Sequence, residues 1–104
     1  MAQDNPNFPI STAAINWFDS SNNLHIRVYS TDGYNVTEWC IDQGGSNSGW
    51  YIGGFSAPGS AVSATAWVTN GDVSIRVYCT FEDSTVELCL DPGGSWYQGA
   101  YTIS

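Results

Sequence analysis

Apolar and polar residues alternate in four short segments within each half of the chain. In the first half these segments lie at about residues 13–18, 23–30, 36–42 and 49–55. Leu24, Ile26 and Val28 occupy every second position of one segment, which is the period of a half-buried strand. Asp32-Gly33 is typical of a tight hairpin turn, and the stretches at 42–45 and 91–94 are typical of later Gly-rich turns. No segment has a helical period, so the sequence predicts an all-β chain.

The two halves of the chain are copies of one unit. Residues 26–29 (IRVY) recur at 75–78, and Glu38 and Cys40 recur as Glu87 and Cys89 with the same offset of 49. We expect an N-terminal extension at residues 1–12, a first repeat at 13–56, a linker at 57–62 and a second repeat at 63–104. Together they form one domain, as the length of 104 residues suggests.

Four antiparallel strands in a unit of this length match one blade of a β-propeller. Propellers have about four to eight blades, so the two blades of one chain cannot close a ring. Two isolated blades would also leave apolar sheet faces in water. The pattern therefore predicts that several copies assemble into a propeller, and a flat sandwich of two sheets is the alternative.

The composition limits the partners of this protein. Two arginines, no lysine and ten carboxylates give a net charge of −8, which excludes a nucleic-acid module and disfavours an anionic membrane surface. No apolar run approaches the roughly 20 residues that span a bilayer, so no membrane insertion is expected. No signal peptide is visible in the first residues, and localisation is left open. Aromatic residues make up 14% and glycine occupies eleven positions, which favours a turn-rich protein with a neutral ligand.

The sequence offers little for catalysis or metal binding. The single histidine, His25, cannot serve a catalytic triad in both repeats and has no partner at metal-ligand spacing, so we expect no catalytic residue, metal or cofactor. Glu38 and Glu87 lie in different repeats, which would set them too far apart for a glycoside hydrolase. Cys40, Cys79 and Cys89 are interpreted as small core residues, and a bridge between Cys40 and Cys89 stays open.

A pair of opposite charges is present once in each repeat. Arg27 with Glu38, and Arg76 with Glu87, place a cation and an anion on strands expected to be adjacent. Guanidinium donors and carboxylate acceptors suit the hydroxyl groups of a sugar. The alternative is a salt bridge that only fixes strand packing.

Tryptophans and turn carboxylates accompany these pairs. Trp50 and Trp96 follow the Gly-rich turns, where they would either stack on a sugar or pack in a core. The other three, Trp17, Trp39 and Trp67, are interpreted as core residues. Asp42 and Asp91 open the turns and are interpreted as structural.

The ordered motifs resemble a known lectin family. They are IRVY at 26–29 and 75–78, TEWC and VELC at 37–40 and 86–89, and GWYIGGF and SWYQGAY at 49–55 and 95–101. This set is similar to the six-bladed β-propeller fucose-binding lectins of the Aleuria type, in particular to short members with two blades per chain. The resemblance implies a homotrimer that binds L-fucose and fucosylated oligosaccharides or glycoconjugates between neighbouring blades, without a metal.

The resemblance also implies the residues of two sites per chain. The first would contain Arg27, Glu38, Gly53 and Gly54, with Trp96, Val73 and Ile75 from the following blade. The second would contain Arg76, Glu87, Gly99 and Ala100, with Trp50, Leu24 and Ile26 of a neighbouring chain. Tyr51 and Tyr97 would contact sugars beyond fucose.

Two departures from the family pattern concern these sites. Family members commonly have Trp after the repeated Cys, where this chain has Ile41 and Leu90, so we expect weaker binding or a shifted preference. The first Gly-rich turn is also longer than the second by three residues (GGSNSGW against GGSW), so the two sites should differ. A structural or protein-interaction propeller, a lectin for a different neutral sugar and a small glycoside hydrolase are the other readings.

Overall fold

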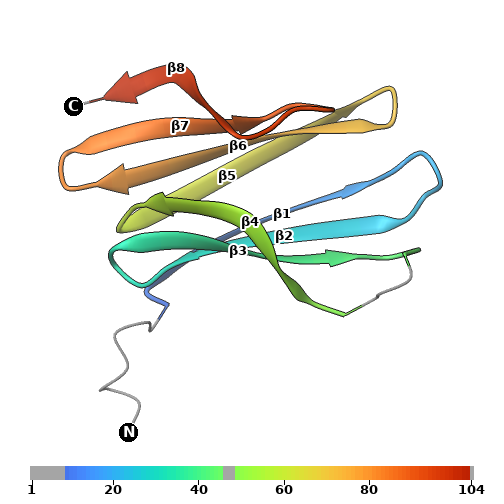
Figure 1. Cartoon of the computed structure of the whole chain (residues 1–104), viewed down its shortest axis with the longest axis horizontal. Coiled ribbons are helices and arrows are strands. Elements are labelled where there is room, and N and C mark those ends of the chain that lie inside the picture. The colour runs from blue at the N-terminus through green and yellow to red at the C-terminus, as the bar shows by residue number, and fades with distance from the viewer. Residues whose placement is uncertain (1–8, 46–48, 104) are drawn as a thin grey trace, which may run out of the picture.

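The computed structural model describes residues 9–45 and 49–103, and every regular element within them is a strand (Figure 1). Four antiparallel strands form each of two sheets, in the order of the sequence. The all-β prediction with two four-stranded units is confirmed. None of the described residues belongs to a helix long and apolar enough to cross a membrane. The strands are β1 (Ser11–Phe18), β2 (Leu24–Thr31), β3 (Asn35–Asp42), β4 (Tyr51–Pro58), β5 (Ala61–Thr69), β6 (Asp72–Phe81), β7 (Ser84–Leu90) and β8 (Tyr97–Ile103).

Tight turns connect the strands where the sequence places Asn, Asp and Gly. The Asp32 carboxylate accepts hydrogen bonds from the backbone N–H groups of Tyr34 and Asn35, and Gly33 follows with a φ of 103°. Between β5 and β6, Asn70 and Gly71 have φ values of 54° and 84°, as a two-residue type I′ turn requires. These turns bring each strand back beside its predecessor.

The strands extend beyond the expected repeat limits. β1 begins at Ser11, and the Ile10 N–H donates to the Thr31 carbonyl over 2.8 Å, so the end of the expected extension joins the sheet. β4 continues to Pro58 and β5 starts at Ala61, which leaves only two residues between the sheets. Ladder hydrogen bonds lengthen the strands here, a contribution that hydrophobic alternation does not reveal. Residues 1–8 and the expected extra turn residues 46–48 lie outside the described part.

The core lies between the two sheets. Figure 1 shows β1–β4 in the lower half of the view and β5–β8 in the upper half, and β1 lies against β5. Because side chains alternate along a strand, one face of each sheet enters this interface. The buried apolar cluster of this core contains Tyr29, Val36, Phe55 and Ala57 from the first sheet and Ile75, Val77 and Cys79 from the second.

The other face of each sheet is also partly apolar but is uncovered in a single chain. Trp39 pairs with Ile52 across β3 and β4, and these side chains are 43% and 66% exposed. On the second sheet Tyr101 and Ile103 are 46% and 54% exposed. A two-sheet sandwich would present polar outer faces, so the exposed apolar side chains favour blades over a sandwich.

The three cysteines are buried free thiols. Cys40, Cys79 and Cys89 form no disulfide, so the bridge left open between Cys40 and Cys89 is absent. Burial raises the pKa of Cys40 and of Cys79 to about 11, which keeps both thiols protonated at neutral pH. They act as small core residues, as the sequence suggested.

Truncation of Val77 should destabilise the protein more than truncation of Val68. Val77 is fully buried between the sheets, whereas Val68 on β5 is 41% exposed. We expect Val77→Ala to lower the free energy of unfolding by about 2 kcal/mol and Val68→Ala by less than about 0.5 kcal/mol. Denaturant unfolding followed by tryptophan fluorescence measures both, and equal losses would contradict this placement of the core.

Candidate functional site

A bulge places one glutamate of each repeat opposite three residues of the next strand. In the β3–β4 pair Thr37 faces Ser56 and Trp39 faces Ile52, so residues 53–55 stand opposite Glu38 alone. In the β7–β8 pair the same shift sets residues 99–101 opposite Glu87. Bulges of this kind redirect side chains and often occur at functional sites.

The glycines in the bulges make room for the glutamate carboxyl groups. A Cβ atom at Gly53 would lie 2.7 Å from the Glu38 carboxyl carbon and 2.8 Å from the Cys40 sulfur. At Gly99 the corresponding distances are 2.8 Å to Glu87 and 2.7 Å to Cys89. Both are too short for a real contact, so each glycine lets a carboxylate lie across the neighbouring strand. Gly54 and Ala100 adjoin these positions in the bulges.

A tyrosine of the repeated IRVY motif holds each glutamate. The hydroxyl of Tyr29 donates to Glu38 Oε2 over 2.7 Å, and that of Tyr78 donates to Glu87 Oε2 over 2.7 Å. The hydrogen bond from Tyr78 lowers the pKa of Glu87 below its ordinary value, which favours the ionised, acceptor form. The second oxygen of each carboxylate is the one beside the bulge glycine.

Each arginine pairs with an aspartate instead of the glutamate. Arg27 Nη1 donates to Asp42 Oδ1 over 2.9 Å, and Arg76 Nη1 donates to Asp91 Oδ1 over 2.9 Å. The expected strands are adjacent, but Glu38 faces Tyr29 in the β2–β3 register. The arginine instead reaches the aspartate that follows two residues after the repeated cysteine, so among the described residues the alternative of a direct Arg–Glu salt bridge is not found, although the two residues lie on adjacent strands as expected.

A tryptophan supports each guanidinium from one side. The Arg27 Cζ lies 5.0 Å from the centroid of the Trp17 ring, and the Arg76 Cζ lies 4.9 Å from that of Trp67. Such cation–π contacts fix the plane of the guanidinium. Arg27 makes its hydrogen bonds to the described residues through Nη1, which leaves Nη2 and Nε for a ligand.

The same aspartates hold a tyrosine of the bulged strand. The Tyr51 hydroxyl donates to Asp42 Oδ2, and the Tyr97 hydroxyl donates to Asp91 Oδ2. Burial alone would raise the pKa of Asp42, but hydrogen bonds from Tyr51, His25 and Arg27 outweigh it and lower this pKa to about 2. One ionised carboxylate therefore orients both the arginine and the tyrosine.

Trp96 of the second sheet packs against the first sheet beside the glutamate. Its ring meets that of Phe55 at a centroid distance of 4.7 Å and an angle of 67°, and that of Tyr29 at 6.4 Å and 85°. Val73, Leu90 and Ile75 belong to the same cluster. The structure therefore brings these residues of the second sheet to the side of the first sheet that carries Tyr29 and Glu38. Ile75 is only 1% exposed, whereas Val73 is half-buried.

The group of residues around Arg76 and Glu87, called the second constellation here as the group around Arg27 and Glu38 is the first, lacks its expected tryptophan within one chain. Tyr78 and Tyr101 repeat the edge-to-face pair of Tyr29 and Phe55, with centroids 5.7 Å apart, but Trp50 is not against them and is 49% exposed. Strand alternation turns Arg76 and Glu87 away from the first sheet, because Ile75 faces that sheet. Leu24, Ile26 and Ile41 lie on the outer face of the first sheet and do not reach the second constellation.

Several contributors were assigned other roles from the sequence. The sequence predicts structural roles for Asp42 and Asp91, which also hold the arginines. It predicts core positions for Trp17 and Trp67: Trp17 packs against the core, whereas Trp67 is 45% exposed, and both rings contact an arginine. The tyrosines of IRVY were not singled out for contact with the glutamates. Each of these three positions, the tryptophan, the tyrosine and the aspartate, recurs in both repeats, and this recurrence is the signal that could have found them.

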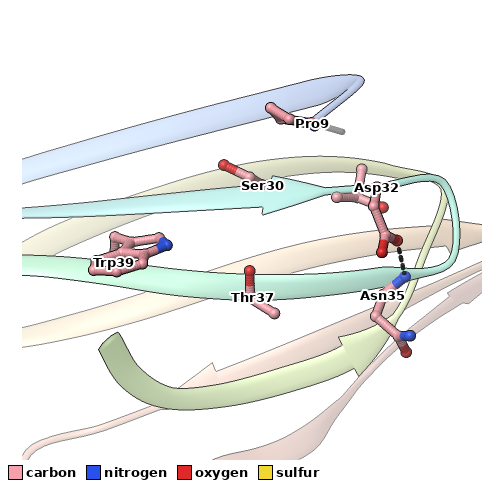
Figure 2. Close-up of a pocket in the computed structure, with 7 residues that line it drawn as sticks. Pro9, Ser30, Asp32, Asn35, Thr37 and Trp39 are labelled. Atoms are coloured by element: carbon pink, nitrogen blue, oxygen red, sulfur yellow. Dashed lines mark hydrogen bonds between the residues drawn. The ribbon is translucent and has the colours of Figure 1, made fainter. Parts of the chain in front are cut away.

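A cavity of about 490 Å³ lies elsewhere on the first sheet (Figure 2). Trp39, Thr37 and Ser30 share one face there, which is opposite to the face of Glu38 by strand alternation. The nearby Asp32 carboxylate is engaged by the turn, as the dashed line to Asn35 shows. The cavity contains none of the charged residues expected to bind a ligand. Its lining is Pro9, Ser30, Thr31, Asp32, Asn35, Thr37 and Trp39.

Comparison with protein families places the chain in one of them. The sequence model of a family described as fungal fucose-specific lectin matches residues 9–104. A comparison with curated proteins finds no match. The matched range covers both sheets and both constellations.

The bulge glycines provide a test of the site geometry. We expect Gly53→Ala to lower the free energy of unfolding by about 1–3 kcal/mol, because the added methyl group displaces the Glu38 carboxylate. Gly54→Ala is the matched control, since nothing lies within 4 Å of its Cβ position. Thermal unfolding of both variants checks this difference, and a Gly53→Ala protein as stable as Gly54→Ala would contradict the close approach.

Proposed function

Because the chain belongs to the fungal fucose-specific lectin family, it is a carbohydrate-binding lectin, and we propose that it binds L-fucose between neighbouring blades. The observation that carries this proposal is the position of Trp96, which the second sheet contributes beside Tyr29 and Glu38 of the first. Polar groups on one blade and an aromatic ring on the next form a site that requires both blades.

The residues of the first site divide the recognition of a sugar among them. The free donors of Arg27 suit ring and hydroxyl oxygens, and Glu38 accepts hydrogen bonds from hydroxyl groups. Gly53 and Gly54 allow the backbone to approach the sugar closely. The indole of Trp96 offers a face to the C–H groups of the sugar. Val73 is available to the fucose methyl group, whereas Ile75 supports the site from inside the core.

The aliphatic residues after the repeated cysteines weaken the proposed sites. Leu90 packs against the same core cluster as Trp96 in the first site, and Ile41 takes the matching position of the second in the sequence. An aromatic ring contributes about 0.5–1.5 kcal/mol beyond burial, which these side chains do not supply. We therefore propose sites of modest affinity that act together.

A homotrimer would complete the second site and close a ring of six blades. Phe55 is 4% exposed beneath Trp96, whereas its counterpart Tyr101 is 46% exposed. Trp50 from another copy would cover Tyr78 and Tyr101 as Trp96 covers Tyr29 and Phe55. The same docking would bury Trp39 and Ile52 on the outer face of the first sheet. Six weak sites on one assembly would gain avidity on a fucosylated surface.

A second candidate is a propeller in which the arginines only stabilise the blades. The ion pairs of Arg27 with Asp42 and of Arg76 with Asp91 favour it, because the first ties β2 to the end of β3 and the second ties β6 to the turn after β7. In that case the glutamates would have no ligand, although their bulges and glycines are built in both repeats.

Removal of one arginine at a time separates these two functions. We expect calorimetric titration with methyl α-L-fucoside to show two sugars per chain for the unaltered protein. Arg27→Ala and Arg76→Ala should each leave one sugar per chain, because each loses the charged donors of one site. Sedimentation velocity should show the same oligomer for all three proteins.

Two results would contradict the proposal. Oligomer dissociation in both arginine variants would assign the arginines to blade packing. A correctly assembled protein that binds no fucoside at millimolar sugar, but binds a different neutral sugar, would change the ligand assignment.

A further inference from the structure

The first repeat contains an imidazole bridge that joins two carboxylates. His25 Nε2 lies 2.9 Å from Asp19 Oδ2, and its Nδ1 lies 2.5 Å from Asp42 Oδ1. The ring stacks on Trp17, with a centroid distance of 5.1 Å and an angle of 9°. His25 is thus fixed between the β1–β2 turn and the end of β3.

The geometry of the bridge fits a protonated ring. An ionised carboxylate only accepts hydrogen bonds, so both ring nitrogens must carry a proton to satisfy both contacts. Burial opposes this charge, but hydrogen bonds to Asp19 and Asp42 outweigh it and raise the pKa of His25 above its ordinary value. The hydrogen bond from His25 is in turn the largest effect that lowers the pKa of Asp19 to about 2.

The groups that face His25 come from four strands and the β1–β2 turn. Asp19 lies in the β1–β2 turn, Asp42 ends β3, and Arg27 extends from β2 to the same Asp42 oxygen as His25. From β4, the Tyr51 hydroxyl donates to the other oxygen of Asp42, and Asp42 raises the pKa of Tyr51 to about 12. From β1, the uncharged ring of Trp17 covers the imidazole. His25 is therefore the group of this cluster that titrates near neutral pH.

The second repeat lacks the bridge and serves as an internal comparison. Ser74 faces Trp67 across the β5–β6 pair, where His25 faces Trp17 across β1 and β2. Thr69, rather than an aspartate, follows Trp67 by two positions. Asp91 keeps its contacts with Arg76 and Tyr97. The Arg–Asp–Tyr unit thus occurs with an imidazole in one repeat and without it in the other.

We propose that His25 is a positioning residue of the first sugar site, whose imidazolium fixes Asp42 and, through it, Arg27 and Tyr51. This inference rests on the proposed function. A neutral imidazole has one N–H and can satisfy only one of the two carboxylates, so the bridge is lost on deprotonation. The first site binds sugar most strongly with His25 protonated, and the second site shows no matching change.

The sign of the pH dependence follows from the raised pKa. The contribution of His25 to sugar binding at the first site is complete below the pKa of about 6.5 that the ring has in the unfolded chain. It is lost as the pH rises through the higher pKa of the folded protein. Asp19 and Asp42 stay ionised across this range, and Tyr51 stays protonated. Affinity at the first site therefore falls toward alkaline pH.

Variants that keep only one of the two sugar sites show the pH dependence of each site separately. Arg76→Ala retains the first site and Arg27→Ala retains the second, and each is titrated with methyl α-L-fucoside from about pH 5 to about pH 9.5. We expect the affinity of Arg76→Ala to fall about tenfold, as for the loss of one charge-assisted hydrogen bond, while that of Arg27→Ala stays constant within about twofold. The double variant Arg76→Ala/His25→Ser carries at position 25 the serine that the second repeat has at Ser74. At acid pH it should bind the fucoside as weakly as the Arg76→Ala protein binds it at alkaline pH.

A direct titration of the ring accompanies the binding measurements. His25 is the only histidine of the chain, so its imidazole nitrogen signals in an NMR spectrum of the labelled protein need no assignment. Both nitrogens should carry protons up to a pH above about 6.5. Equal pH dependence at the two sites, or a ring that is neutral at pH 6, would overturn the role of His25. Absence of fucoside binding to every protein at every pH would instead overturn the proposed function.

Discussion

The packing of Trp96 against Phe55 and Tyr29 is the interaction on which fold and site both depend. It joins the two sheets through three aromatic rings, and it buries the tyrosine whose hydroxyl holds Glu38. The same indole stands at the border between the blades, where a sugar would contact it. The cluster that packs the core is therefore also the one proposed to bind the ligand, on rigid strands rather than on a loop.

The few cations of this chain form ion pairs with carboxylates close to them in the fold. The chain has ten carboxylates and two arginines, and each arginine forms an ion pair with one aspartate, which also accepts a hydrogen bond from a tyrosine. The glutamates are held by tyrosines instead, and the bulges direct them across glycine. Cation and acceptor are thus fixed separately on one sheet face, which leaves both able to bind hydroxyl groups. A direct Arg–Glu pair would have satisfied each with the other.

Much of the fold follows from local sequence, whereas the partners in the site do not. Alternation around Leu24 and Ile26, the Asp32-Gly33 turn and the duplication predict the strands and their order, because these signals act between neighbours in the chain. The choice of Asp42 over Glu38 as partner of Arg27 depends on the register of β2 with β3, and no residue type reveals it. The strand ends at Ser11 and Pro58 depend on ladder hydrogen bonds alone. In the proposed trimer the companions expected for Arg76 would come from another copy, which no signal within one chain can show.

The central claim is that a sugar lies between two blades, with charged groups on one and an indole on the other. A crystal structure of the protein with methyl α-L-fucoside tests it most directly. The account predicts a fucoside whose hydroxyl groups meet Arg27 and Glu38 and whose ring lies on Trp96, with a second fucoside between Arg76 of one chain and Trp50 of its neighbour. Fucoside found instead in the cavity beside Trp39 and Thr37, with Glu38 unoccupied, would contradict it.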